Sequence, residues 1–276
     1  MALKREAAAA VAIPIVLAIL FFTPPFLFDL LVAAVALAAL WEFYGLAEKT
    51  GYPVAKTVGM FAGVVCIPLA LISGSDIYVM DVYFVTGGLW AGVLILFAVL
   101  SAVAPLLARV NPGAALGGAA STLFGVFLIA LPATAICSLR DFSPRAVLFL
   151  FLIVWGCDSF AYYIGKNFGR RKLAPFVSPN KTWEGTIGGL SGATLVGAAA
   201  GAWWVMPELG PVRGALAGAL ASSAGQIGDL VESLWKRGAG VKDSGVFLPG
   251  HGGFYDRIDS LLFAGPVLAA FVAHLS

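Results

Sequence analysis

The chain has 276 residues, of which 60% are hydrophobic and only 12% are charged, and its mean hydropathy is +0.94. This composition lies far outside that of soluble globular domains, so it excludes an ordinary soluble enzyme and predicts an all-α integral membrane protein. The formal net charge of +2 favours neither a nucleic-acid partner nor an acidic one.

Apolar runs follow one another along the chain and are separated by short polar stretches. A spanning helix needs about 20 apolar residues. The runs predict a polytopic protein with about nine transmembrane helices, at residues 7–22, 26–47, 54–73, 82–104, 116–138, 146–164, 185–205, 214–234 and 258–275. Because these helices fill the chain, we expect one transmembrane domain over residues 1–276, made of N-terminal helices at 1–140 and of helices with long polar loops at 146–276.

The first run follows a charged start, as the apolar region of a signal peptide does. Residues 21–25, FFTPP, offer a poor small-residue cleavage site, so we expect a retained first helix. This run is short, and Pro24 with Pro25 predicts a tight turn after it. The first two helices could therefore instead form one hairpin that does not fully cross the bilayer.

The basic residues fall mostly on one side of the predicted topology. Of the 17 lysines and arginines, all except Arg140, Arg145 and Arg213 lie on the side of the N-terminus. By the positive-inside rule, the N-terminus and the two long polar connections, residues 165–184 and 235–257, face the cytoplasm. We therefore expect a multi-pass protein of the cytoplasmic (inner) membrane whose polar loops lie on the cytoplasmic side.

Glycine and alanine are frequent in two of the predicted helices, at residues 188–202 and 214–225. Small residues let helices approach closely in lipid, so we expect these stretches to be packing surfaces. The three cysteines, Cys66, Cys137 and Cys157, lie inside apolar runs without the spacing of metal ligands. We expect them to be small buried residues.

Five carboxylates lie within predicted spans, and an ionisable group at bilayer depth costs at least about 2.5 kcal/mol unless it faces protein, water or a metal ion. Asp29 and Glu42 lie near the ends of the second span, where an interfacial, structural role is favoured. Asp158, Asp229 and Glu232 lie near the cytoplasmic ends of their spans, and a basic loop follows each span.

Two pairs of carboxylates share the same spacing. Asp229 and Glu232 are three residues apart and project from one helix face, and Asp256 and Asp259 repeat this spacing at the start of the last span. Carboxylates that converge from two helices repel one another unless a cation lies between them, and hard oxygen ligands favour Mg2+. The four residues therefore predict a divalent cation site. The alternative is a set of salt bridges at helix ends, in which Asp256 pairs with Arg257 or Lys236.

Two loops carry residues suited to phosphate binding. Residues 244–253 are rich in glycine, whose backbone can approach a phosphate closely, and Lys242, His251 and Arg257 supply donors at the edges of this loop. The second loop, SPNKTWEG at residues 178–185, precedes a helix, and a helix N-terminus with hydroxyl groups and a lysine is an anion site. It could also be a simple helix cap with a lysine placed by the positive-inside rule.

Three segments of the second half match the pattern of a known family. They are SLWKRGAGVKDSGVFLPGHGGFYDRID at residues 233–259, WGCDSFAYYIGKNFGRRKLAPFVSPNKTWEG from Trp155, and GQIGDLVESLWKR from Gly225. Over residues 155–259 the chain resembles the phosphatidate cytidylyltransferases, also called CDP-diacylglycerol synthases. The first half is similar to them only in its hydropathy.

This resemblance implies transfer of a cytidylyl group from CTP to phosphatidic acid, which gives CDP-diacylglycerol and pyrophosphate in phospholipid biosynthesis. The lipid phosphate is already anionic, so no protein nucleophile is required, and the main barrier is repulsion between the phosphates. Metal ions and cations that neutralise and align phosphates suit this reaction. The resemblance further implies Mg2+ as the essential ion, K+ as a candidate second ion, and a homodimer.

The resemblance also assigns roles to individual residues. The acids of the GDL and DRID segments, Asp229 and Asp256, are expected to hold the metal, with Glu232 and Asp259 as further ligands. The residues expected to act in catalysis are Asp229, Asp256, Lys242, Arg257, Asp243 and His251. The residues expected to bind substrate are Ser178, Asn180, Lys181, Ser233, Lys236, Arg237, Asp158 and Gly252.

Two other functions stay open at this point. A cation-coupled transporter would also have acids within spans and glycine-interrupted helices, but its acids should lie near the bilayer midplane. A related enzyme would use CTP on another membrane lipid, such as a polyprenol or an ether lipid. The acids here gather toward one face beside basic loops, which favours a one-sided reaction of CTP and lipid at the membrane surface, with no nucleic-acid partner.

Overall fold

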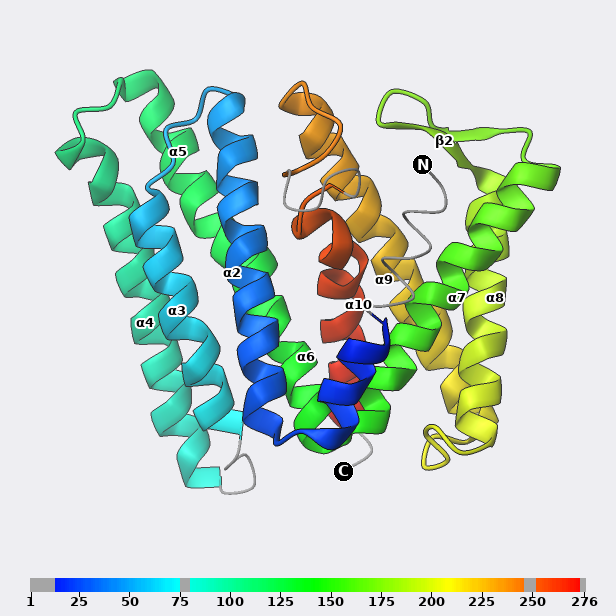
Figure 1. Ribbon diagram of the computed structural model, residues 1–276. Coiled ribbons are helices and arrows are strands. Elements are labelled where there is room, and N and C mark those ends of the chain that lie inside the picture. Colours follow the sequence, from blue (N-terminus) through cyan, green and yellow to red (C-terminus); the bar gives the residue numbers. More distant parts are fainter. Residues whose placement is uncertain (1–12, 75–79, 246–251, 274–276) are drawn as a thin grey trace. The chain divides into compact units, whose positions relative to one another are not determined.

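The computed structural model describes residues 13–74, 80–245 and 252–273. Within these residues the chain folds into helices and one two-stranded sheet (Figure 1). After an apolar helix at Ile13–Phe22, the elements are α2 (Pro25–Lys49), α3 (Lys56–Gly74), α4 (Met80–Leu107), α5 (Pro112–Gly125), a π-helical turn (Val126–Ala130), α6 (Leu131–Phe142), α7 (Pro144–Phe168), β1 (Lys172–Ala174), β2 (Ser178–Thr182), α8 (Trp183–Ala202), α9 (Gly210–Gly238) and α10 (Tyr255–Ala273).

The prediction of a helical protein is confirmed, and each predicted span overlaps a helix in the described ranges. The first helix ends at Phe22 and α2 begins at Pro25, so the two prolines separate them as expected. Among the described residues, three segments are long and apolar enough to cross a membrane: Pro25–Lys49, Pro112–Phe142 and Pro144–Phe168. The helices thus fit a membrane protein, while the number of spans and their orientation stay predictions.

Helix starts follow local side-chain chemistry. At the start of α5, the side chain of Asn111 accepts a hydrogen bond from the backbone N–H of Gly113 at 3.0 Å. At the start of α7, Ser143 accepts one from Arg145 at 3.2 Å. A proline follows each cap, where its missing N–H is no loss because first-turn N–H groups have no partner within the helix. The sequence therefore sets these boundaries locally.

The chain divides into two compact units. The first comprises Met1–Phe28, Leu139–Arg237 and Arg257–Ser276, and the second comprises Asp29–Ser138 and Gly238–Asp256. Each unit combines segments that are distant in sequence. The split into residues 1–140 and 146–276 follows chain order instead, and it stays a prediction.

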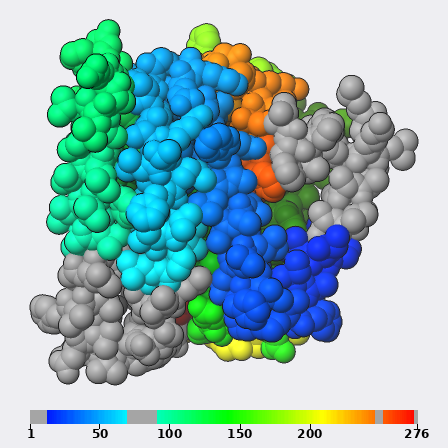
Figure 2. Space-filling view, turned by 60° about the vertical axis from the view of Figure 1, so that its left-hand side comes forward, coloured from blue at the N-terminus to red at the C-terminus, as the bar shows by residue number. Residues whose placement is uncertain are grey.

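In the second unit, α2, α3 and α4 lie side by side (Figures 1 and 2). A buried polar contact ties α2 to α5, because Tyr44 Oη donates to the carbonyl oxygen of Thr122 at 2.7 Å. Thr122 Oγ1 in turn accepts from the backbone N–H of Ala55, just before α3, at 3.0 Å. Large apolar side chains such as Phe61 and Ile95 are exposed on these helices, as expected of a surface that contacts lipid.

In the first unit, glycines bring α8 close to its neighbours. Gly197 on α8 and Gly214 on α9 each lie against the other's carbonyl oxygen, and a Cβ atom on Gly218 would lie 2.5 Å from the carbonyl oxygen of Ala193. Nearer the start of α8, a Cβ atom on Gly189 would lie 2.9 Å from atoms of α7. The predicted packing role of the small-residue stretches is confirmed. All three cysteine thiols are also buried, as expected.

We expect Gly218→Ala to destabilise the protein by about 1–3 kcal/mol, because its methyl group would force the backbones of α8 and α9 apart. Thermal unfolding of the detergent-purified protein measures this loss. Gly92→Ala is the matched control, since a Cβ atom there meets nothing within 4 Å and alanine favours the helix by about 1 kcal/mol. Equal melting temperatures for the two variants would contradict the packing role.

Candidate functional site

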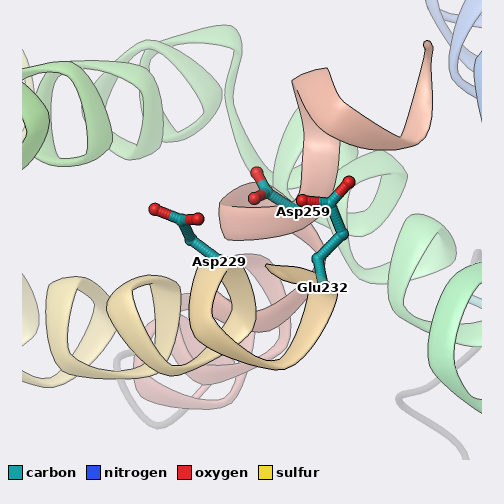
Figure 3. Close-up of side chains that lie close together, drawn as sticks. All are labelled: Asp229, Glu232 and Asp259. Carbon is teal, nitrogen blue, oxygen red and sulfur yellow. The ribbon is translucent and has the colours of Figure 1, made fainter. Parts of the chain in front are cut away.

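Three carboxylates gather where α9 and α10 meet within the first unit (Figure 3). Asp229 and Glu232 project from α9, and Asp259 projects from the N-terminal part of α10. One oxygen atom of each residue lies within 4.8 Å of the corresponding atoms of the other two. The sequence predicted the common helix face of Asp229 and Glu232 and their convergence with Asp259.

Two lysines balance part of this charge. Lys181 Nζ lies 2.6 Å from Asp229 Oδ2, and Lys236 Nζ lies 2.6 Å from Glu232 Oε2. Lys236 follows Glu232 by one helical turn, and the Glu232 side chain is only 1% exposed. These two salt bridges have other partners than the predicted alternative, which paired Asp256 with Arg257 or Lys236.

The donor set nevertheless fits a divalent cation. Asp158 does not belong to this group of three, but it is a fourth carboxylate and lines the same cavity as Asp229. With all groups ionised, four carboxylates and the two ammonium groups of Lys181 and Lys236 leave two net negative charges, which one divalent ion neutralises. Clustered carboxylate oxygens are ligands that Mg2+ prefers. The residues present can thus hold such an ion.

A cavity of about 430 Å³ adjoins Asp229 in the first unit, a volume typical of small-molecule sites. Its lining includes Asp158, Asn180, Lys181 and Asp229, which the sequence assigned to the site from three separate segments. Gln226, one turn before Asp229, also lines it and donates through Nε2 to the carbonyl oxygen of Thr186 at 3.3 Å. Sequence analysis missed Gln226, although it lies in the GQIGDL segment.

A β-hairpin holds Lys181 at this cavity. Strands β1 and β2 pair antiparallel with Lys172 opposite Thr182, whereas the sequence predicted only a loop here. Thr182 then caps α8, because its Oγ1 accepts from the backbone N–H of Gly185 at 3.1 Å. Thr182 is thus a helix cap, as the simpler alternative expected, while its neighbour Lys181 contacts Asp229.

Glu184 ties the start of the hairpin to α8. Its carboxylate accepts hydrogen bonds from the backbone N–H groups of Arg170 at 3.0 Å and Arg171 at 3.2 Å. The bond from Arg170 is the main reason why the pKa of the Glu184 carboxyl is held below its usual value. The backbone between α7 and α8 is therefore tied to the first turn of α8.

Asp256 lies in a hydrogen-bonded network of the second unit. Its Oδ2 atom accepts from the backbone N–H of Ser244 at 2.9 Å, from Ser244 Oγ at 2.8 Å and from the backbone N–H of Gly253 at 2.7 Å. These donors fix the orientation of the carboxylate. The predicted metal role of Asp256 stays a prediction.

Glu42 of α2 enters the same network. Its Oε1 atom accepts from the backbone N–H of Phe254 at 3.0 Å, and its Oε2 atom accepts from that of Tyr255 at 2.9 Å and from Ser244 Oγ at 2.8 Å. The sequence predicted an interfacial, structural role for Glu42 and did not show these partners. An acid inside a largely apolar helix was the available signal, but its partners lie about 200 residues further along the chain, beyond the reach of any local pattern.

Glycines surround these two carboxylates. A Cβ atom on Gly245 or on Gly253 would collide with the Glu42 carboxylate, and one on Gly252 would lie 2.6 Å from Asp256 Oδ2. Gly252 also has a φ of +77°, which side chains with a Cβ atom rarely adopt. The contact that accounts for these glycines is thus with protein carboxylates, and phosphate binding by Gly252 stays a prediction.

The remaining predicted site residues occupy varied positions. Lys242, Asp243 and Arg257 are exposed, and Ser233 is buried with its Oγ 3.5 Å from Asp229 Oδ1. Arg237 Nε donates to the carbonyl oxygen of Val177, before β2, at 3.2 Å. Ser178 is half-buried at the start of β2. His251 lies outside the described residues.

Comparison with known proteins agrees with the sequence resemblance. A model of the family described as the cytidylyltransferase family matches residues 3–275. A phosphatidate cytidylyltransferase of Haemophilus influenzae is 34% identical over 290 residues, which cover 97% of each chain. One of Pseudomonas aeruginosa is 37% identical over 98% of this chain and 96% of its own. A third, of Staphylococcus aureus, is 47% identical over 44% of this chain and 46% of its own.

The family model extends the similarity from the matching segments to nearly the whole length, including the first half. Two of the relatives also cover nearly all of this chain and nearly all of their own. The chain therefore belongs to the cytidylyltransferase family.

Proposed function

We propose that this protein transfers the cytidylyl group of CTP to phosphatidic acid, giving CDP-diacylglycerol and pyrophosphate. The observation that carries the proposal is the carboxylate cluster with its two lysines, beside a cavity, in a chain similar over its whole length to phosphatidate cytidylyltransferases. Apolar helices suit a lipid substrate, and clustered oxygen ligands and cations suit a nucleoside triphosphate.

In the proposed reaction, an oxygen of the lipid phosphate attacks the α-phosphorus of CTP. A new P–O bond forms on the side opposite the bridging oxygen, whose bond to the α-phosphorus breaks, and pyrophosphate leaves with the electron pair. The attacking oxygen is already an anion, so no protein nucleophile and no strong base are needed. The task of the protein is therefore to align two negatively charged groups.

Asp229, Glu232 and Asp259 would hold Mg2+, and the bound ion would neutralise phosphate charge. Asp256 is also proposed as a metal ligand. Lys181, at the cavity, would bind a substrate phosphate when it exchanges its contact with Asp229 for that phosphate. Lys236 and Arg237, in the last turn of α9, extend the positive charge. Ser178, Asn180, Asp158, Ser233 and Gly252 are the further residues proposed to bind substrate.

The remaining predicted roles rest on the loop around Asp256. Lys242, Asp243 and Arg257 are exposed, so they can approach substrate from solvent, and His251 belongs to the same segment of the sequence. We further propose about nine spans, a cytoplasmic N-terminus, a site facing the cytoplasm of the inner membrane, K+ as a second ion, and a homodimer. The distribution of basic residues supports the orientation.

Membership of the family favours an enzyme over a cation-coupled transporter. Incubation of the purified protein with labelled CTP, Mg2+ and a panel of lipids tests the activity. We expect labelled CDP-diacylglycerol and pyrophosphate with phosphatidic acid, and no product with a polyprenol or an ether lipid. Product from another lipid alone would overturn the proposed substrate.

Asp229→Asn should reduce CDP-diacylglycerol formation by roughly 100-fold or more, because it removes a charged oxygen ligand from the cluster. Product formation is measured on purified protein, with gel filtration to show that the variant is folded. Glu208→Gln, an exposed acid between α8 and α9, is the matched control and should keep normal activity. Full activity of Asp229→Asn would remove the residue from the site.

Lys181→Ala should raise the KM of a phosphate substrate by about 10–100-fold, the loss expected for one charge-assisted contact. Steady-state kinetics with CTP and phosphatidic acid varied in turn identify which substrate is affected. Lys172→Ala removes an exposed lysine from the opposite strand of the same hairpin, and its KM values should be unchanged. If Lys181→Ala leaves both KM values unchanged, Lys181 does not bind substrate.

A further inference from the structure

The contacts of Glu42 are unusual for an acid in an apolar helix. Its two oxygens lie within hydrogen-bond distance of three donor groups in the segment that leads into α10: the Ser244 hydroxyl, whose single proton also faces Asp256, and two N–H groups. Two of them are the backbone N–H groups of Phe254 and Tyr255, at the start of α10, where a negative charge is favoured by the helix dipole. Glu42 thus anchors this segment from a different helix.

The anchor is linked to Asp256 through one side chain. Ser244 Oγ lies 2.8 Å from Glu42 Oε2 and 2.8 Å from Asp256 Oδ2. Asp256 also accepts from the backbone N–H of Gly253, the residue before the Phe254 and Tyr255 N–H groups that Glu42 holds. A displacement of Glu42 would therefore move donors on both sides of the Asp256 carboxylate.

We propose that Glu42 is a positioning residue of the reaction, which holds Ser244, Phe254 and Tyr255 so that the Asp256 carboxylate keeps the orientation needed to bind the metal ion. This inference rests on the proposed function, in which Asp256 is a metal ligand. Outer residues that orient a metal ligand commonly contribute 10–100-fold to metal affinity or activity. A carboxylate held by several fixed donors is such a ligand.

Glutamine cannot replace Glu42 in this arrangement. An amide has one acceptor oxygen, and its NH2 group only donates. In one orientation the NH2 group faces the N–H of Tyr255, and in the other it faces that of Phe254. Either way two donors meet, and one end of the anchor is lost while the size of the side chain is unchanged.

The test uses purified full-length protein, with Mn2+ as the probe of the metal site. Electron paramagnetic resonance gives the Kd for Mn2+, and the activity assay gives the Mg2+ concentration for half-maximal rate. We expect Glu42→Gln to raise both by about 10–100-fold. The KM for CTP at saturating Mg2+ should change less, because the substrate-binding side chains are untouched.

The control is Glu48→Gln. It makes the same chemical change on the same helix, where Glu48 pairs with Lys56 at 2.7 Å and has no contact with the Ser244–Tyr255 segment in the described structure. Its Mn2+ affinity should equal that of the unaltered protein. A normal Mn2+ Kd for folded Glu42→Gln, with activity reduced only in proportion to a lower melting temperature, would show a purely structural role and overturn the inference.

Two more variants keep the outcomes distinct. Ser244→Ala removes only the hydroxyl link and keeps the backbone bond to Asp256, so it should raise the Mn2+ Kd by a smaller factor. If Glu42→Gln does not fold, the Ser244→Ala variant tests the inference instead, and an unchanged Mn2+ Kd of that variant overturns it. If Asp256→Asn leaves the Kd unchanged, the metal role of Asp256 and the inference both fail. Absence of cytidylyl transfer by the unaltered protein contradicts the proposed function alone, because the Mn2+ measurements still stand.

Discussion

Carboxylates inside an apolar helical protein need partners, and this constraint shapes the structure more than any other. Taking an ionised acid out of water costs several kcal/mol unless charge or hydrogen bonds replace the lost solvation. Most of this chain offers neither, since its helices consist largely of aliphatic residues, alanine and glycine. The positions where acids occur are therefore the positions where donors, cations or metal ions must also be present.

The protein meets this requirement in two ways. At the cluster of Asp229, Glu232 and Asp259, two lysine side chains compensate part of the negative charge. Both side chains are long and flexible enough to give up their contacts with the carboxylates. Around Glu42 and Asp256, backbone N–H groups and a single hydroxyl do so instead. Ammonium groups can be exchanged for a metal ion, whereas backbone donors fixed by a turn and a helix start cannot move away. One arrangement suits binding and release, and the other suits orientation.

The sequence predicted the features that depend on local pattern. Helices appear where apolar runs predicted them, and Asp229 and Glu232 share a face because they are three residues apart. The pair of Glu232 and Lys236 was also predictable, since a glutamate four residues before a lysine is a favourable helix pair. The hairpin at 172–182 was not predictable, because Pro179 and Asn180 are poor strand residues. Its stability comes instead from contacts with the start of α8 and within its own loop.

The partner of Glu42 was beyond prediction for a different reason. Its donors are mostly backbone groups, which carry no side-chain signature, and they lie about 200 residues away in the chain, where no periodicity extends. The glycines of the Ser244–Tyr255 segment were conspicuous, but their cause was not. They suggested an approach to phosphate, and in the structure Gly245, Gly252 and Gly253 make room for the protein's own carboxylates.

The direct contact between Gly197 and Gly214 also limits how this sequence can change during evolution. In a core of large side chains, a substitution that adds volume can be offset by a second one that removes it on the opposite side. Here each residue already has no side chain, so no second substitution can create the missing space. We therefore expect homologous chains that keep this helix pairing to have glycine at both positions. Larger residues should occur there only where the two helices lie further apart.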